Sequence, residues 1–136
     1  MKDLEGRHLR AGWWGLAIFV VLGAVLEGLH ALKSPVFVDA GRETTRMMLR
    51  LAHSHGTLVA MVNILYALTL GARPSAAERP FASASLLAAL VLLPGGFFLG
   101  ALFAHGGDPG LGIVLVPVGA LAVTLGAGLV ARAMKS

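Results

Sequence analysis

Long apolar stretches separated by short polar breaks dominate the pattern of hydrophobic and polar positions along this chain. The apolar windows cover residues 12–34, 48–71, 81–104 and 111–131. Each is about as long as the roughly 20 residues that a helix needs to cross the hydrocarbon core of a bilayer. A helix also pairs its backbone polar groups internally, which lipid requires. The pattern therefore predicts an all-α protein, an integral membrane four-helix transmembrane bundle that forms a single domain over residues 1–136.

The composition agrees with a membrane protein. The mean hydropathy is +0.80 and 13% of the residues are charged, whereas soluble domains carry about 25% charged residues. The chain has no cysteine, so disulfides and thiolate metal sites are excluded. The net charge of +4 comes from Lys and Arg that flank the apolar windows, where they act as topology signals. We therefore expect a lipid bilayer as partner, and no nucleic acid.

The orientation follows from the distribution of the basic residues. Four spans place both termini on one side, which carries seven of them, and the other side carries four. The seven are Lys2, Arg7, Arg10, Arg73, Arg79, Arg132 and Lys135, and the four are Lys33, Arg42, Arg46 and Arg50. By the positive-inside rule both termini are predicted to be cytoplasmic, and we expect a bacterial inner membrane.

Small residues recur at helical spacing in the last two windows. Gly96 and Gly100 form a G-x-x-x-G motif, and Ala120, Thr124 and Gly128 form a second row of small side chains. Such motifs let helix backbones approach closely in lipid. The motifs predict close packing within the bundle or between chains, as in a homo-oligomer or a subunit of a membrane complex.

Glu27 is a carboxylate near the outer end of the first window, one helical turn before His30. A carboxylate at the centre of a membrane helix is unfavourable by about 2.5 to 3.5 kcal/mol. The same helical face carries Ala17, Val20, Ala24 and Ala31, so we expect Glu27 to face the bundle. Two interpretations stay open. In the first, Glu27 pairs with Arg50 or a histidine and serves packing. In the second, it is a metal ligand, a second-shell group or a proton relay.

Four of the five histidines are predicted to lie at the outer end of the bundle, and they come from three helices. They are His30, His53, His55 and His105. His53 and His55 are about 200° apart around a helix, so we expect only one of them to face inward. His53 continues into the small-residue row Gly56, Ala60, Asn63 and Ala67, whereas His55 continues into Val59, Val62 and Tyr66. The pattern therefore favours His53. Asp108 lies three residues after His105 and is interpreted as a turn or N-cap residue.

Residues 50–58 read RLAHSHGTL. This segment resembles the second helix of subunit I of the haem-copper oxidases and of smaller subunit-I-like membrane proteins, where a histidine in a His-Gly-Thr context ligates the low-spin haem. His55, Gly56 and Thr57 match that context. The resemblance covers about one helix of four, and the family's later histidine-rich patterns are absent. The resemblance implies a haem or metal ligand at His55, whereas the small-residue row favours His53, and the absent patterns argue against oxidase activity.

The preferred functional hypothesis is a His/Glu site near the outer face that binds haem b or a transition metal, for electron transfer or metal handling. Copper is favoured, and iron and zinc also accept imidazole ligands. The candidate ligands are Glu27, His30, His53, His55 and His105, with Arg50 and Asp108 beside Glu27 as second-shell or proton-relay groups. One alternative is a structural or interaction membrane protein without a cofactor. Another is a small proton-coupled transporter or quinone-reactive protein that uses Glu27 and His30.

Overall fold

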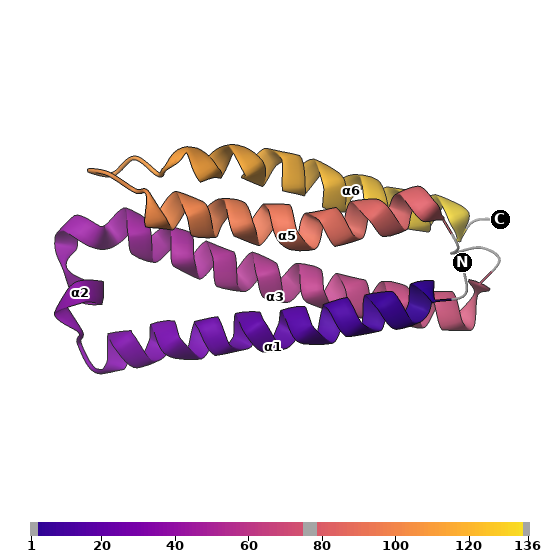
Figure 1. The fold of residues 1–136 in the computed structure, drawn as a ribbon, viewed down its shortest axis with the longest axis horizontal. Helices are drawn as coiled ribbons and strands as arrows, with labels where there is room; N and C mark the ends of the chain where they lie inside the picture. Colours follow the sequence, from indigo (N-terminus) through magenta and orange to yellow (C-terminus); the bar gives the residue numbers. More distant parts are fainter. Residues whose placement is uncertain (1–2, 75–78, 135–136) are drawn as a thin grey trace.

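The computed structural model describes residues 3–74 and 79–134. Its four long helices run side by side along the length of the molecule (Figure 1). They are α1 (Leu4–Ala31), α3 (Glu43–Ala72), α5 (Pro80–Leu102) and α6 (Leu115–Ala133). Short helical segments lie in the connections at the end of the bundle opposite the chain ends: α2 (Pro35–Val38) and η1 (Ala40–Arg42) between α1 and α3, and η2 (Leu111–Val114) before α6.

The all-helical prediction is confirmed over the part of the chain that the structure describes. Four helices are long and apolar enough to cross a membrane, as the four windows predict. α1 begins at Leu4 and not near residue 12, because the polar residues before the apolar window contain no proline and continue the same helix. Helix α3 also extends past the start of its apolar window, and it begins at Glu43.

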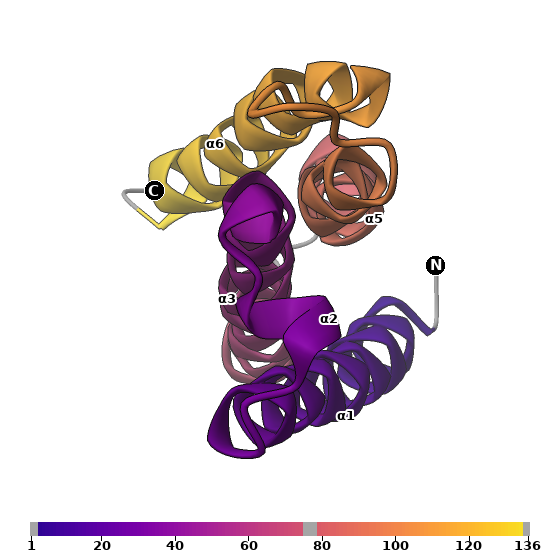
Figure 2. The same cartoon turned by 90° about the vertical axis from the view of Figure 1, so that its left-hand side faces the viewer.

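The helices form an open arrangement. α1 packs along α3, α3 along α5, and α5 along α6, while α1 meets α5 at only a few positions. Viewed along the bundle, α3 separates α1 from the pair of α5 and α6 (Figure 2). The fraction of buried residues in the most apolar part of each span differs between the helices. It is 39% for α3 and 44% for α5, but only 22% for α1 and 11% for α6. α3 and α5 are therefore inner helices, and α1 and α6 are outer ones.

The G-x-x-x-G motif brings α5 close to the last helix, as predicted. A Cβ atom placed on Gly96 would lie 2.9 Å from the backbone nitrogen of Val116 and 3.1 Å from the carbonyl oxygen of Gly112. Gly100 lies against Ile113, where a Cβ would be 3.7 Å from the nearest atom. In lipid, such close approach replaces the hydrophobic driving force that packs helices in water.

Only the first residue of the small-residue row on α6 packs inside the chain, because Ala120 is half-buried against the core cluster. α6 buries Gly119 and Gly126 against α5. Thr124 and Gly128 are exposed, and a Cβ on Gly128 would meet no atom within 4 Å. Thr124 and Gly128 are therefore not covered by the rest of the described chain.

The two ends of the described chain lie at the same end of the bundle. Leu4 and Met134 pack against one cluster of buried side chains formed by Tyr66, Leu70 and Leu86. At the opposite end, the guanidinium of Arg46 donates hydrogen bonds to the carbonyl oxygens of Phe37 (2.8 Å) and Asp39 (2.6 Å). The outer connection is thereby fixed to the start of α3.

Candidate functional site

His53 lies in the interface between α3 and α1. Its Nδ1 donates a hydrogen bond to the carbonyl oxygen of Phe19 at 2.6 Å. The imidazole fills the space that the missing side chain of Gly23 leaves, and a Cβ there would overlap the ring. Since Nδ1 carries the proton, Nε2 holds the lone pair.

His55 lies on the other side of the same helix, towards α5. Its Nδ1 donates to the carbonyl oxygen of Leu51 at 2.9 Å, and its ring centroid is 4.8 Å from that of Phe97. The expectation that only one of the two histidines faces inward is wrong. Because α3 is an inner helix, a rotation of about 200° moves a side chain from the α1 interface to the α5 interface.

The buried residues of α3 likewise lie on two sides of the helix. Gly56, Ala60, Asn63 and Ala67, which continue the row of His53, are buried, as the preferred pattern requires. Val59 and Tyr66, from the row of His55, are buried as well. An inner helix needs an apolar face towards each of its two neighbours, and each row supplies one of these faces.

His30 meets Arg50 at the C-terminal end of α1. The guanidinium of Arg50 donates to His30 Nδ1 at 3.1 Å, and both side chains are exposed. The His30 ring also lies 6.2 Å, centroid to centroid, from Phe37. This polar contact joins α1 to α3 just outside the apolar part of the bundle.

Glu27 is exposed and does not face the bundle, which corrects the expectation from sequence. The residues that share its face are exposed as well: Ala17, Val20, Ala24 and Ala31. α1 instead buries Gly12, Gly15, Gly23 and Leu26, because glycine permits the closest approach to α3. Glu27 and Arg50 form no ion pair; the only one among the described side chains joins Arg10 to Asp3.

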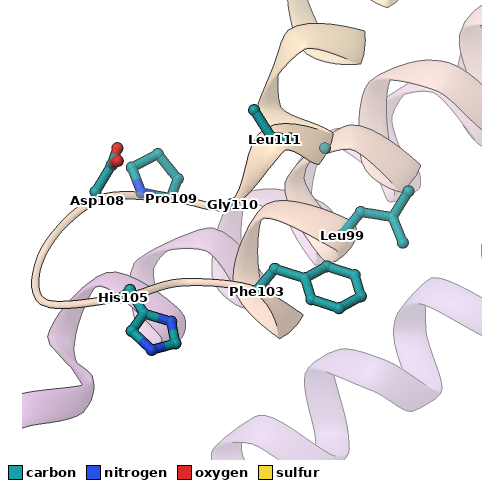
Figure 3. Close-up of a pocket in the computed structure, with 8 residues that line it drawn as sticks. Leu99, Phe103, His105, Asp108, Pro109, Gly110 and Leu111 are labelled. Carbon is teal, nitrogen blue, oxygen red and sulfur yellow. The ribbon is translucent and has the colours of Figure 1, made fainter.

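His105 and Asp108 form the tight turn between α5 and η2. Their backbones exchange two hydrogen bonds of 2.9 Å, and Gly106 and Gly107 between them have φ of 56° and 105°, which glycine adopts readily. The imidazole and the carboxylate point to opposite sides of the turn (Figure 3). Asp108 is therefore a turn residue, and Gly110 occupies the N-cap position before η2.

A pocket of about 510 Å³ lies at this turn (Figure 3). Its lining residues are Leu99, Phe103, His105, Asp108, Pro109, Gly110, Leu111 and Gly112. Only two of these bear side chains that can be charged, and they diverge. The pocket therefore presents one imidazole above an apolar floor and no set of converging ligands.

The expected ligands do not come together in one chain. They are Glu27, His30, His53, His55 and His105. Across residues 3–74 and 79–134, no three His, Asp or Glu side chains lie close enough to hold one metal ion. Two of the histidines are separated by α3 itself, and the others lie in exposed outer contacts. Binding of a metal or haem stays a prediction.

A buried polar network joins three helices at a place that the sequence analysis did not single out. His8 of α1, Asn63 of α3 and Ser83 of α5 are all fully buried. His8 Nδ1 is 2.7 Å from Asn63 Oδ1, and His8 Nε2 is 2.9 Å from Ser83 Oγ. The His8 ring also meets the Tyr66 ring edge to face at 4.7 Å. The sequence feature that could have indicated this network is the presence of polar side chains, Asn63 and Ser83, inside the second and third apolar windows.

The partners of the network fix its hydrogen-bond directions. The Asn63 amide nitrogen donates to the carbonyl oxygens of Val59 (2.9 Å) and Leu86 (3.2 Å), so its oxygen accepts from His8 Nδ1. Arg7 donates to Ser83 Oγ at 2.8 Å, and the Ser83 hydroxyl can donate its own hydrogen to His8 Nε2. This assignment gives a neutral imidazole with both nitrogens satisfied. The network can hold α1, α3 and α5 in register.

Comparison with known proteins gives no relative from which a function could be transferred. No protein-family model, curated protein or solved structure matches the chain.

Proposed function

We propose that this chain is an integral membrane protein that acts by assembly within the bilayer, as a structural or interaction protein without a metal or haem cofactor. The observation that carries the proposal is the division of the histidines among separate contacts. His53 belongs to the α1 interface, His55 to the α5 interface, and His30 and His105 to exposed contacts at the outer end.

The use of the other polar side chains supports the same function. His8, Asn63 and Ser83 satisfy one another between helices, which is how polar groups inside a membrane protein commonly stabilise helix association. On the outer helix α6, the exposed Thr124 and Gly128 present a surface that a helix backbone can approach. We propose that this surface packs against a second copy of the chain.

The proposed location is a bacterial inner membrane, with both termini in the cytoplasm. The support is the excess of Lys and Arg on the terminal side. The packing of Leu4 and Met134 on one cluster also agrees with termini on a single side.

A second candidate function is the haem or copper site expected from the sequence. The favourable observation is that Nδ1 of both His53 and His55 is tied to a backbone carbonyl, which orients an imidazole for ligation through Nε2. Thr57 Oγ1 is also buried without a hydrogen-bond partner among the described residues. Since α3 separates the two imidazoles, such a site would need a ligand from a second chain.

Purified protein separates the two candidates. We expect protein prepared without chelator to show no Soret band and to contain well below one metal ion per chain, because no set of ligands converges. We also expect a mass above the 14.0 kDa of one chain in mild detergent, and a return to the monomer mass for Gly128→Leu, since a Cβ there meets no atom of its own chain. Absorption spectra, metal analysis and light scattering are the measurements.

Two results would contradict the proposed function. A Soret band or stoichiometric metal that is lost in His55→Ala or His53→Ala would favour the second candidate. A wild-type protein that is monomeric in mild detergent would remove the proposed contact between copies.

A further inference from the structure

An apolar groove runs between α1 and α5 in the middle of the membrane-spanning helices, with a volume of about 550 Å³. Gly15 and Pro94 are buried at its floor, and the exposed side chains of Trp14, Ile18, Val91 and Phe98 form its two rims. All of its lining residues are apolar or aromatic. The groove exists because α1 and α5 both pack on α3 but meet each other at only a few positions.

We propose that this groove binds one acyl chain of an anionic phospholipid. Along α1 the groove extends from Ala11 to Leu22, which is about 16 Å at the helical rise of about 1.5 Å per residue. This length is close to half of the roughly 30 Å hydrocarbon core, and so to one acyl chain. An occupant without polar groups is required, since the lining offers a buried polar group almost no hydrogen-bond partner.

The size of the groove favours a thin chain over a helix. Its volume of about 550 Å³ lies in the range of about 300 to 1,000 Å³ that small-molecule sites have. A helix is about 10 to 12 Å across, much wider than an extended acyl chain. A second copy of the chain could touch the rims but not fill the floor.

The head group has a complementary site next to the groove. A smaller pocket of about 370 Å³ is lined by Leu9, Arg10, Trp13 and Trp14, and it shares Trp14 with the groove. Arg10 is the only charged residue of this pocket, and a guanidinium can bind a phosphate through two parallel hydrogen bonds. Its ion pair with Asp3 joins side chains that are 66% and 67% exposed. Such surface pairs are weak, so a lipid phosphate can replace the Asp3 carboxylate.

Lipid retention by the purified protein tests the proposal, independently of the proposed function. The probes are dioleoylphosphatidylglycerol and dioleoylphosphatidylcholine, added in mild detergent and counted per chain by native mass spectrometry. Gly95 lines the groove, and a Cβ there meets no atom within 4 Å, so Gly95→Leu fills the groove without disturbing the fold. Gly28→Leu is the matched control, because its Cβ is equally unobstructed and Gly28 lines none of the pockets described.

We expect the wild type and Gly28→Leu to retain one phosphatidylglycerol, and Gly95→Leu to bind it about tenfold more weakly, because leucine displaces at least two methylene groups. Arg10→Gln should lower the preference for phosphatidylglycerol over phosphatidylcholine about fivefold. Equal retention by the wild type and Gly95→Leu would overturn the site. Equal retention of the two lipids by the wild type would overturn the anionic head group. A change of oligomer mass in Gly95→Leu without loss of lipid would assign the groove to a second copy.

Discussion

Replacing Gly96 by leucine is expected to separate α5 from α6 and to destabilise the protein by about 3 kcal/mol, the upper part of the usual range for overpacking. A Cβ at this position would come within 2.9 Å of a backbone nitrogen of Val116 and 3.1 Å of a backbone oxygen of Gly112. Backbone atoms cannot rotate away as a flexible side chain can, so the helices must move apart. Thermal unfolding in detergent, followed by circular dichroism, measures the effect.

Two further glycine substitutions calibrate this result. Gly100→Leu should destabilise the protein less, because a Cβ at Gly100 makes an ordinary contact of 3.7 Å with Ile113. Gly28→Leu should leave the unfolding temperature unchanged, because a Cβ there meets nothing within 4 Å. If all three variants unfold at the same temperature as the wild type, α5 and α6 do not pack as described.

The second large effect is expected in the buried network. Asn63→Leu removes the acceptor for His8 Nδ1 and leaves that buried donor without a partner, which is unfavourable by about 1 to 3 kcal/mol. His8→Phe should have a similar effect, because Asn63 Oδ1 then loses its donor. Both variants should lower the free energy of unfolding, measured in the same detergent.

The double variant distinguishes a network from general sensitivity of the core. When both partners become apolar, neither side of the His8–Asn63 hydrogen bond is left unsatisfied, so the loss in His8→Phe with Asn63→Leu should be smaller than the sum of the single losses. Thr69→Val is the control on the same helix, since Thr69 is half-buried and its hydroxyl donates to the carbonyl oxygen of Leu65 in its own helix. Strictly additive losses would show that the polar contacts are not coupled.

The helices and several of their contacts could be predicted from the sequence. Four apolar windows gave four long helices, because a helix satisfies its own backbone in lipid. The G-x-x-x-G motif at Gly96 marks a close helix contact. The row of small residues after His53 is buried. These features depend on local periodicity and on residue size, which a single sequence contains.

The neighbours of each helix could not be predicted, and the errors follow from this. The face of α1 that contains Glu27 was expected to be buried because it carries small alanine side chains. The structure instead packs the glycine face of α1 against α3. The choice between His53 and His55 assumed a helix with one inward face, whereas α3 has neighbours on both sides. The partners of His8 lie 55 and 75 residues away along the chain, a distance that no local pattern spans.

The central claim is that His53 and His55 belong to different helix interfaces, so one chain does not gather a histidine site. The chain has no cysteine, so introduced pairs can be cross-linked with a short thiol-reactive reagent in membranes. Four double variants combine Gly23→Cys or Phe97→Cys with His53→Cys or His55→Cys. We expect rapid cross-linking for Gly23 with His53 and for Phe97 with His55, and none for the crossed pairs. Equal cross-linking of the matched and crossed pairs would contradict it.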